Sequence, residues 1–178
     1  MYLDFYGERL RLARLLKGVT LQELGDAVSV SRQGIHQYES DARAPSMDVR
    51  NALAEYLEVS PSFFGMPMAG DVKPEQCHFR KRQTTPVGVK ERVQAYSTIL
   101  EQLVVELNEH LDMPQNGFNL IDNTKITELT PPIIEKIAEG ARLRWNLSAD
   151  APIDNMVNVL ENQGAIVTCF DGDRKSVV

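Results

Sequence analysis

Residues 20–40 contain the pattern that most restricts the fold, because it predicts two short helices on either side of a tight turn. Thr20 is a favourable N-cap, and Glu23 three positions later completes a capping box. The apolar stripe of this first helix is made by Leu21, Leu24 and Ala27. We therefore expect the first helix to run from Leu21 to Val28, followed by a turn at Ser29 and Val30.

The second helix of the pair begins after Ser31, which is again a favourable N-cap. Helical spacing turns Ile35 and Tyr38 inward. It leaves an outer polar face made by Arg32, Gln33, His36 and Gln37. No acidic residue lies between Ser31 and Tyr38. This is the layout of a helix-turn-helix, whose second helix enters the major groove of DNA.

The outer face has the chemistry that reads bases. Arginine makes bidentate contacts with guanine, and glutamine does so with adenine. We therefore predict that four residues read bases: Arg32, Gln33, His36 and Gln37. The alternative is a helical bundle that serves only as a scaffold or a protein contact.

The stretch from Phe5 to Phe64 resembles the lambda-repressor-like (XRE-family) helix-turn-helix domain. The resemblance rests on spacing as well as composition, at Gly7-Glu-Arg-Leu-Arg, Arg14, Thr20-Leu-Gln-Glu-Leu, Val30-Ser31, Ile35, Tyr38-Glu39, Pro45 and Leu53-Ala54. It implies a five-helix domain in residues 1–65, in which Arg32, Gln33 and Gln37 face bases. It also implies that Arg14 and Glu39 pair across the bundle.

The same resemblance places phosphate contacts at the start of the second helix and in the loop from Ser40 to Arg43. Our candidates for the phosphate backbone are Thr20, Gln22, Ser31, Ser40 and Arg43. Two positions depart from the family pattern. Ser29 replaces a glycine in the turn, where positive φ costs a non-glycine residue about 1 kcal/mol, and Gly25 replaces an alanine at the helix crossing.

Helical patterns continue beyond a proline- and glycine-punctuated linker at residues 66–88. A long amphipathic helix is predicted from apolar residues three and four apart, at Val93, Tyr96, Leu100, Leu103, Val104, Leu107 and Leu111, ending by Pro114. Further helices are expected at Pro132–Trp145 and Pro152–Asn162, and a short strand at Ala165–Phe170. We thus predict a mainly α chain with a helical domain at residues 89–178.

This C-terminal part resembles the opening of an ImmA/IrrE-type metallopeptidase domain. The resemblance rests on Cys77-His-Phe-Arg-Lys-Arg, Val87-Gly-Val-Lys-Glu-Arg-Val, Leu143-Arg-Trp-Asn-Leu and the stretch from Pro152 to Val167. That family binds zinc through His-Glu-x-x-His, which this sequence lacks: His36, His78 and His110 stand far apart. We therefore expect no catalytic residue, metal or cofactor in this chain, although a longer parent protein would be a zinc peptidase if the motif followed.

Composition limits the cellular setting. The net charge of −6 does not exclude DNA binding, because the distribution of charge matters more than the total. Cys77 and Cys169 are too few for a disulfide framework, and no apolar run is long enough for a membrane span or signal peptide. We expect a cytoplasmic protein.

The sequence thus predicts a transcriptional regulator that binds double-stranded DNA as a homodimer on an inverted repeat. Two alternatives remain open: the N-terminal fragment of a DNA-targeted zinc endopeptidase that cleaves a partner repressor, and an antitoxin-type module. The C-terminal region is a candidate contact for a protein partner. The long helix fits either burial in its own domain or dimerisation.

Overall fold

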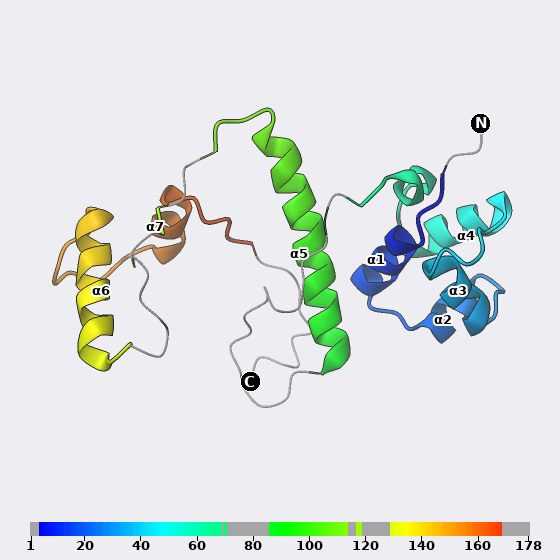
Figure 1. Ribbon diagram of the computed structural model, residues 1–178, viewed down its shortest axis with the longest axis horizontal. Helices are drawn as coiled ribbons and strands as arrows, with labels where there is room; N and C mark the ends of the chain where they lie inside the picture. Colours follow the sequence, from blue (N-terminus) through cyan, green and yellow to red (C-terminus); the bar gives the residue numbers. More distant parts are fainter. Residues whose placement is uncertain (1–3, 69, 71–85, 114–116, 119–128, 169–178) are drawn as a thin grey trace. The chain divides into compact units, whose positions relative to one another are not determined.

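A computed structural model describes residues 4–68, 70, 86–113, 117–118 and 129–168 (Figure 1). The fold is mainly α-helical, as predicted. The described residues form α1 (Gly7–Lys17), α2 (Leu21–Ala27), α3 (Arg32–Glu39), α4 (Met47–Leu57), the 3-10 helix η1 (Pro61–Gly65), α5 (Val87–Asn108), α6 (Pro131–Arg144) and α7 (Met156–Asn162). The chain divides into two compact units, Met1–Glu109 and His110–Val178.

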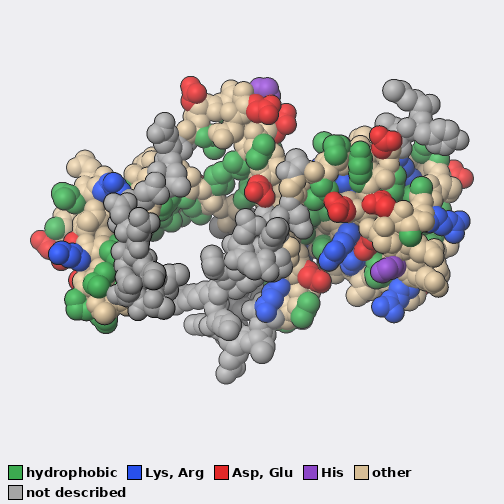
Figure 2. All heavy atoms as spheres, in the orientation of Figure 1, with side chains coloured by type: hydrophobic (Ala, Val, Ile, Leu, Met, Phe, Trp, Pro, Cys, Tyr) green, Lys and Arg blue, Asp and Glu red, His purple; other side chains and the backbone are tan. Residues whose placement is uncertain are grey.

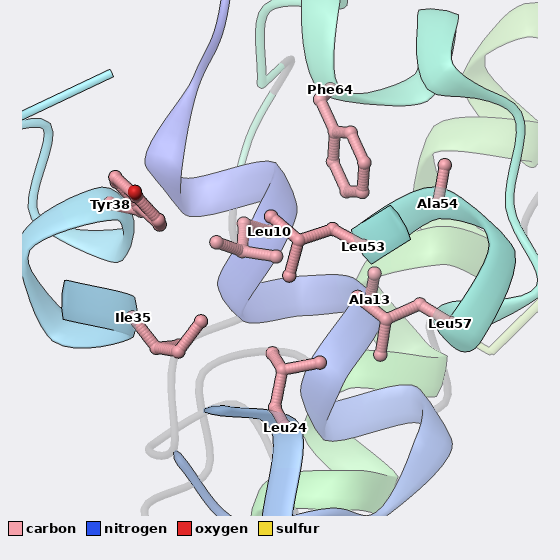
Figure 3. Close-up of a cluster of buried hydrophobic side chains, with 9 residues drawn as sticks. All are labelled: Leu10, Ala13, Leu24, Ile35, Tyr38, Leu53, Ala54, Leu57 and Phe64. Carbon is pink, nitrogen blue, oxygen red and sulfur yellow. The ribbon is translucent and has the colours of Figure 1, made fainter. Parts of the chain in front are cut away.

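The core of the first unit joins α1, α2, α3, α4 and η1. Figure 3 shows side chains from all five elements converging on one cluster, made by Leu10, Ala13, Leu24, Ile35, Tyr38, Leu53, Ala54, Leu57 and Phe64. All nine are at most 5% exposed. Burial of a full-sized apolar side chain contributes about 1.5–3 kcal/mol, so this cluster holds the short helices in fixed orientations.

Helix α5 packs on α1 within the same unit. Ala95 and Thr98 are buried at this contact. Arg9 of α1 is also buried, and its Nη1 donates to Oε1 of Gln102 over 2.8 Å. Its Nε and Nη2 donate to the carbonyls of Met66 and Pro67, so one guanidinium ties α1 to both η1's end and α5.

The second unit has little core among its described residues. Trp145 lies edge-on to Phe118, with ring centroids 5.6 Å apart, and its Nε1 donates to the carbonyl of Gly117. Ala141 is the buried residue of this part of the structure, whereas Leu143 is 83% exposed. These helices therefore bury much less apolar surface than α1 to α4.

Most predicted helices are confirmed, with shifted ends. The long helix begins at Val87, earlier than its apolar pattern, and ends at Asn108; Pro114, its predicted stop, lies outside the described residues. The helix predicted at Pro152–Asn162 starts only at Met156, because the side chain of Asn155 caps the backbone there by accepting from Asn158 N. The fifth helix of the N-terminal domain is the 3-10 turn η1.

The predicted strand at Ala165–Phe170 is wrong where it can be judged. Residues 165–168 have no strand structure, and Cys169 and Phe170 lie outside the described residues. A strand requires a neighbour for its backbone hydrogen bonds. No other strand exists in the part of the chain that the structure describes, so the β-branched composition alone does not produce one.

The described residues include neither a membrane-spanning helix nor a cluster of metal ligands. No helix among them is long and apolar enough to cross a membrane. Nor does that part of the chain bring three His, Cys, Asp or Glu side chains together in a group able to hold a metal ion.

Candidate nucleic-acid interface

The helix pair has the caps that the sequence predicts. Thr20 and Glu23 form the capping box of α2: Glu23 N donates to Thr20 Oγ1 and Thr20 N donates to Glu23 Oε2. The hydrogen bonds that the Glu23 carboxyl accepts from the backbone and side chain of Thr20 lower its pKa. Ser31 begins α3, with its Oγ accepting from Gly34 N over 3.1 Å. Each cap supplies a partner for a backbone N–H that the helix itself cannot bond.

The turn between these helices is closely packed. Ser29 has φ of 56°, the left-handed conformation expected of a position that favours glycine. Val30 N donates to the carbonyl of Gly25 over 2.9 Å. A Cβ on Gly25 would collide with the carbonyl oxygen of Val30, so glycine at this helix crossing lets the turn approach α2.

Helix α3 has an inner and an outer face. Ile35 is fully buried and Tyr38 is 5% exposed, and both join the core. On the other side Arg32, Gln33 and His36 are exposed and Gln37 is partly buried. Figure 2 shows basic side chains and a histidine at the surface over the α2–α3 part of this unit.

The four outer side chains of α3 have no partners of their own among the described residues. Hydrogen bonds and ion pairs there involve none of Arg32, Gln33, His36 and Gln37 through their side chains. Their hydrogen-bond donors and acceptors are therefore not used by other described residues. The structure therefore brings all four predicted base-reading residues together on one accessible helix face.

The side chains of the five predicted phosphate-binding residues differ in how many hydrogen-bond donors are still available for a phosphate. A phosphate oxygen only accepts hydrogen bonds. The Ser31 hydroxyl accepts from the backbone and keeps its own hydrogen, whereas the Thr20 hydroxyl accepts from Glu23 N and is also hydrogen-bonded to the Glu23 carboxylate. Gln22 uses one amide hydrogen on Asp26. Ser40 Oγ already donates to the carbonyl of His36 over 2.9 Å. Thr20 and Ser40 are thus the poorest donors of the set.

Arg43 is exposed, in the loop between α3 and α4. Its backbone N donates to the carbonyl of Gln37 over 3.2 Å, which ties the loop to the end of α3. Its guanidinium has no hydrogen bond to a described residue, so all of its N–H donors are available for a phosphate.

The carboxylates of Glu39 and Asp41, near α3, bind other groups of the protein itself. The predicted pair of Arg14 and Glu39 is confirmed: Nε lies 2.6 Å from Oε1 and Nη2 lies 3.0 Å from Oε2, with the side chains 11% and 8% exposed. Asp41 Oδ1 accepts from Gly7 N over 2.6 Å. Both negative charges are thereby engaged away from the outer face of α3.

The contact of Asp41 with Gly7 was not predicted. It fills the role of an N-cap for α1, where Tyr6 supplies no side-chain hydrogen bond. A Cβ on Gly7 would lie 2.6 Å from the carbonyl oxygen of Glu39, and closer still to that of Tyr38. No local pattern reveals this pairing, because the two partners are 34 residues apart.

Comparison with known proteins agrees with this geometry. Residues 10–64 match the model of the helix-turn-helix family. An "SPbeta prophage-derived uncharacterized HTH-type transcriptional regulator YonR" of Bacillus subtilis (strain 168) is 34% identical over 58 residues. The similarity covers 33% of this chain and 54% of the relative, so the chain spans about half the length of the protein it matches. No solved structure matches.

The family match ends before the linker, so the resemblance of the C-terminal part to an ImmA/IrrE-type domain stays a prediction. For the N-terminal part, the element order, the capped helix pair and the family match agree. Over residues 10–64 the chain is therefore similar to a helix-turn-helix domain.

Proposed function

We propose that this protein is a transcriptional regulator that binds double-stranded DNA in a sequence-specific manner, as a homodimer on an inverted repeat. Arg32, Gln33, His36 and Gln37 read bases. Gln22, Ser31 and Arg43 hold phosphates, with smaller contributions from Thr20 and Ser40. The observation that carries the proposal is the outer face of α3, where four polar side chains have no described partner inside the protein.

The dimensions of α3 suit this role. An α-helix with its side chains is about 10–12 Å in diameter, and the major groove of B-DNA, about 12 Å wide, admits it. The inner residues Ile35 and Tyr38 anchor α3 in the core, so the helix meets DNA as a rigid element. Bidentate contacts by Arg32 or a glutamine are worth about 1–3 kcal/mol of discrimination against a wrong base.

The first experiment is selection of bound sequences from a random pool of duplexes by the full chain. We expect an enriched inverted repeat whose half-sites are about one helical turn apart. Enrichment of no sequence at low ionic strength contradicts the proposal.

Base reading by Arg32 is tested by measuring the affinity of Arg32→Ala for the selected operator and for random DNA. We expect a loss of about 5- to 150-fold on the operator and a much smaller loss on random DNA. Arg11→Ala is the matched control, because it removes the same charge from an exposed position on α1. Equal losses for Arg32→Ala on both DNAs would refute base reading.

Phosphate contact by Arg43 predicts a different signature. Arg43→Ala should weaken binding to both DNAs alike and reduce the slope of log affinity against log salt by about one unit. A loss confined to the operator would instead assign Arg43 to a base.

We infer no enzymatic activity for this chain, and we expect it to act in the cytoplasm, where its DNA would lie. The largely exposed apolar side chains of α6 and α7 suit a protein partner or further chain. The presence or absence of a His-Glu-x-x-His helix in a longer parent protein tests the peptidase alternative. Recovery of one stoichiometric partner by a chain that ignores its promoter would favour the antitoxin alternative.

A further inference from the structure

Helix α5 has one face fixed to α1. Ala95 is 2% exposed and Thr98 is fully buried on this face, and Gln102 accepts from Arg9. Arg92 Nε donates to the carbonyl of Leu16 over 3.2 Å near the start of α5. These contacts are spread over more than two helical turns, so α5 is part of the same unit as the helix-turn-helix domain.

A second, apolar face of α5 is turned away from α1. At about 100° per residue its members fall within an arc of roughly 100°, and we call them the outer stripe: Val89, Val93, Tyr96, Leu100, Leu103, Val104 and Leu107. Leu103 is 52% exposed, Val89 38% and Leu107 36%, and the other four members are partly buried. Figure 2 shows hydrophobic side chains over the C-terminal half of α5. Exposed apolar residues that line up along a helix are typical of an interface.

Charges along the edge of the outer stripe indicate the partner. Lys90 and Glu101 lie on the same edge, eleven residues or three turns apart. That separation is about 16 Å along the axis, too far for an ion pair within one helix. Neither side chain forms an ion pair with a described residue.

A second copy of α5 would satisfy both charges. Two helices packed side by side about a twofold axis perpendicular to them are antiparallel, and each contact then occurs twice. With the axis passing close to Tyr96, Lys90 of each copy faces Glu101 of the other. The same axis places Val89 of one copy opposite Leu103 of the other, so the apolar and the charged contacts agree on one register.

We propose that α5 is the homodimer interface of this protein, formed by antiparallel packing of the outer stripe against that of a second copy. The inference deepens the proposed function by naming the surface that brings two recognition helices together. Helix α5 contacts α1, whereas α3 packs on α1 and α2, so this pairing leaves the outer face of α3 free.

A charge exchange tests the register, with the full chain studied by sedimentation in the absence of DNA. We expect the wild type to be a dimer of the 20.0 kDa chain. Lys90→Glu and Glu101→Lys should each raise the dimer dissociation constant about tenfold, because each sets two like-charged pairs opposite one another. The double exchange K90E/E101K should return it to within about threefold of the wild type.

Recovery of dimerisation in the double variant distinguishes this register from a general effect of charge, because residues 90 and 101 are too far apart to pair within one helix. A double variant as weak as the single variants would overturn the register, and a monomeric wild type would overturn the dimer interface. Thermal unfolding of each variant identifies any that fails to fold.

The apolar part of the interface has a matched pair of variants. Leu103→Asp should dissociate the dimer, whereas Val105→Asp should leave it intact, because Val105 is 53% exposed but lies off the outer stripe. Equal effects of the two variants would overturn the assignment. If residues 110–178 or an unrelated protein cover the outer stripe instead, Leu103→Asp will not change the oligomeric state.

DNA binding separates this inference from the proposed function. The monomeric Leu103→Asp variant should still prefer a single half-site over random DNA. If the wild type is a dimer through α5 but binds no duplex, the proposed function fails and the interface stands. If the protein binds an inverted repeat as a dimer, and neither the charge substitutions at Lys90 and Glu101 nor Leu103→Asp weakens that dimer, the interface fails and the function stands.

Discussion

The ion pair between Arg14 and Glu39 offers the sharpest test of how this domain is held together. Arg14 makes three hydrogen bonds, two to Glu39 and one from Nη1 to the carbonyl of Val19 over 3.0 Å. Arg14→Ala removes all three and leaves a carboxylate whose side chain is only 8% exposed. Loss of one partner of a buried pair typically costs 3–5 kcal/mol, and we expect about 3 kcal/mol here because the site lies near the surface.

For a domain of this size, that loss lowers the melting temperature by roughly 12–24 °C. Circular dichroism of the full chain during heating measures it. The matched control is Lys17→Ala, which breaks the ion pair of Lys17 with Glu58, whose side chains are 32% and 76% exposed. An exposed pair contributes little, so the control should shift the melting temperature by less than about 4 °C.

Two further measurements complete this test. Below its melting temperature, Arg14→Ala should keep the base preference of the wild type, since Arg14 holds α3 in place without touching DNA in the proposed complex. Arg14→Met combined with Glu39→Leu should recover much of the stability, because it leaves no unpaired buried charge. A melting temperature for Arg14→Ala within a few degrees of the wild type would refute the structural role of the pair.

Three other substitutions probe the backbone around the helix pair. Gly7→Ala should destabilise the domain by about 1–3 kcal/mol in urea unfolding, because its Cβ meets backbone carbonyls; Gly88→Ala, with nothing within 4 Å, should not, and similar losses at both sites would argue against the close approach. Ser29→Gly should stabilise the domain by about 1 kcal/mol by relieving its positive φ, and an unchanged unfolding midpoint would count against strain there. The lowered pKa of Glu23 means that its capping contribution is fully present above its usual value near 4.5 and is lost as the pH falls through the lower folded value. The stability advantage of the wild type over Glu23→Gln should therefore shrink on acidification, and a constant difference from pH 7 to pH 3 would contradict it.

Local patterns were sufficient to predict the helix pair. Thr20, Glu23 and Ser31 act on backbone groups at most three residues away, so their effect can be read from neighbours in the chain. The inward positions of Ile35 and Tyr38 follow from helical spacing for the same reason. The outer face of α3 was predictable because it is what remains once those residues are buried.

The C-terminal part was less predictable. Residues 165–168 have strand-forming composition but no strand, because a strand depends on a partner strand whose position in the sequence is not fixed by local pattern. The predicted start of α7 was too early. It relied on Pro152, because proline is favoured in the first turn of a helix, but the helix begins after the N-cap at Asn155.

By itself, then, the sequence determined the helix pair α2 and α3, the caps that begin them, and the polar face of α3, since all of these depend on interactions within a few residues. Only the tertiary structure decided that Asp41 caps α1, that Arg9 links α1 to Gln102 of α5, and which face of α5 is left for a partner. Such contacts join residues 34 and 93 positions apart, and their free energy exists only after the chain has folded back on itself.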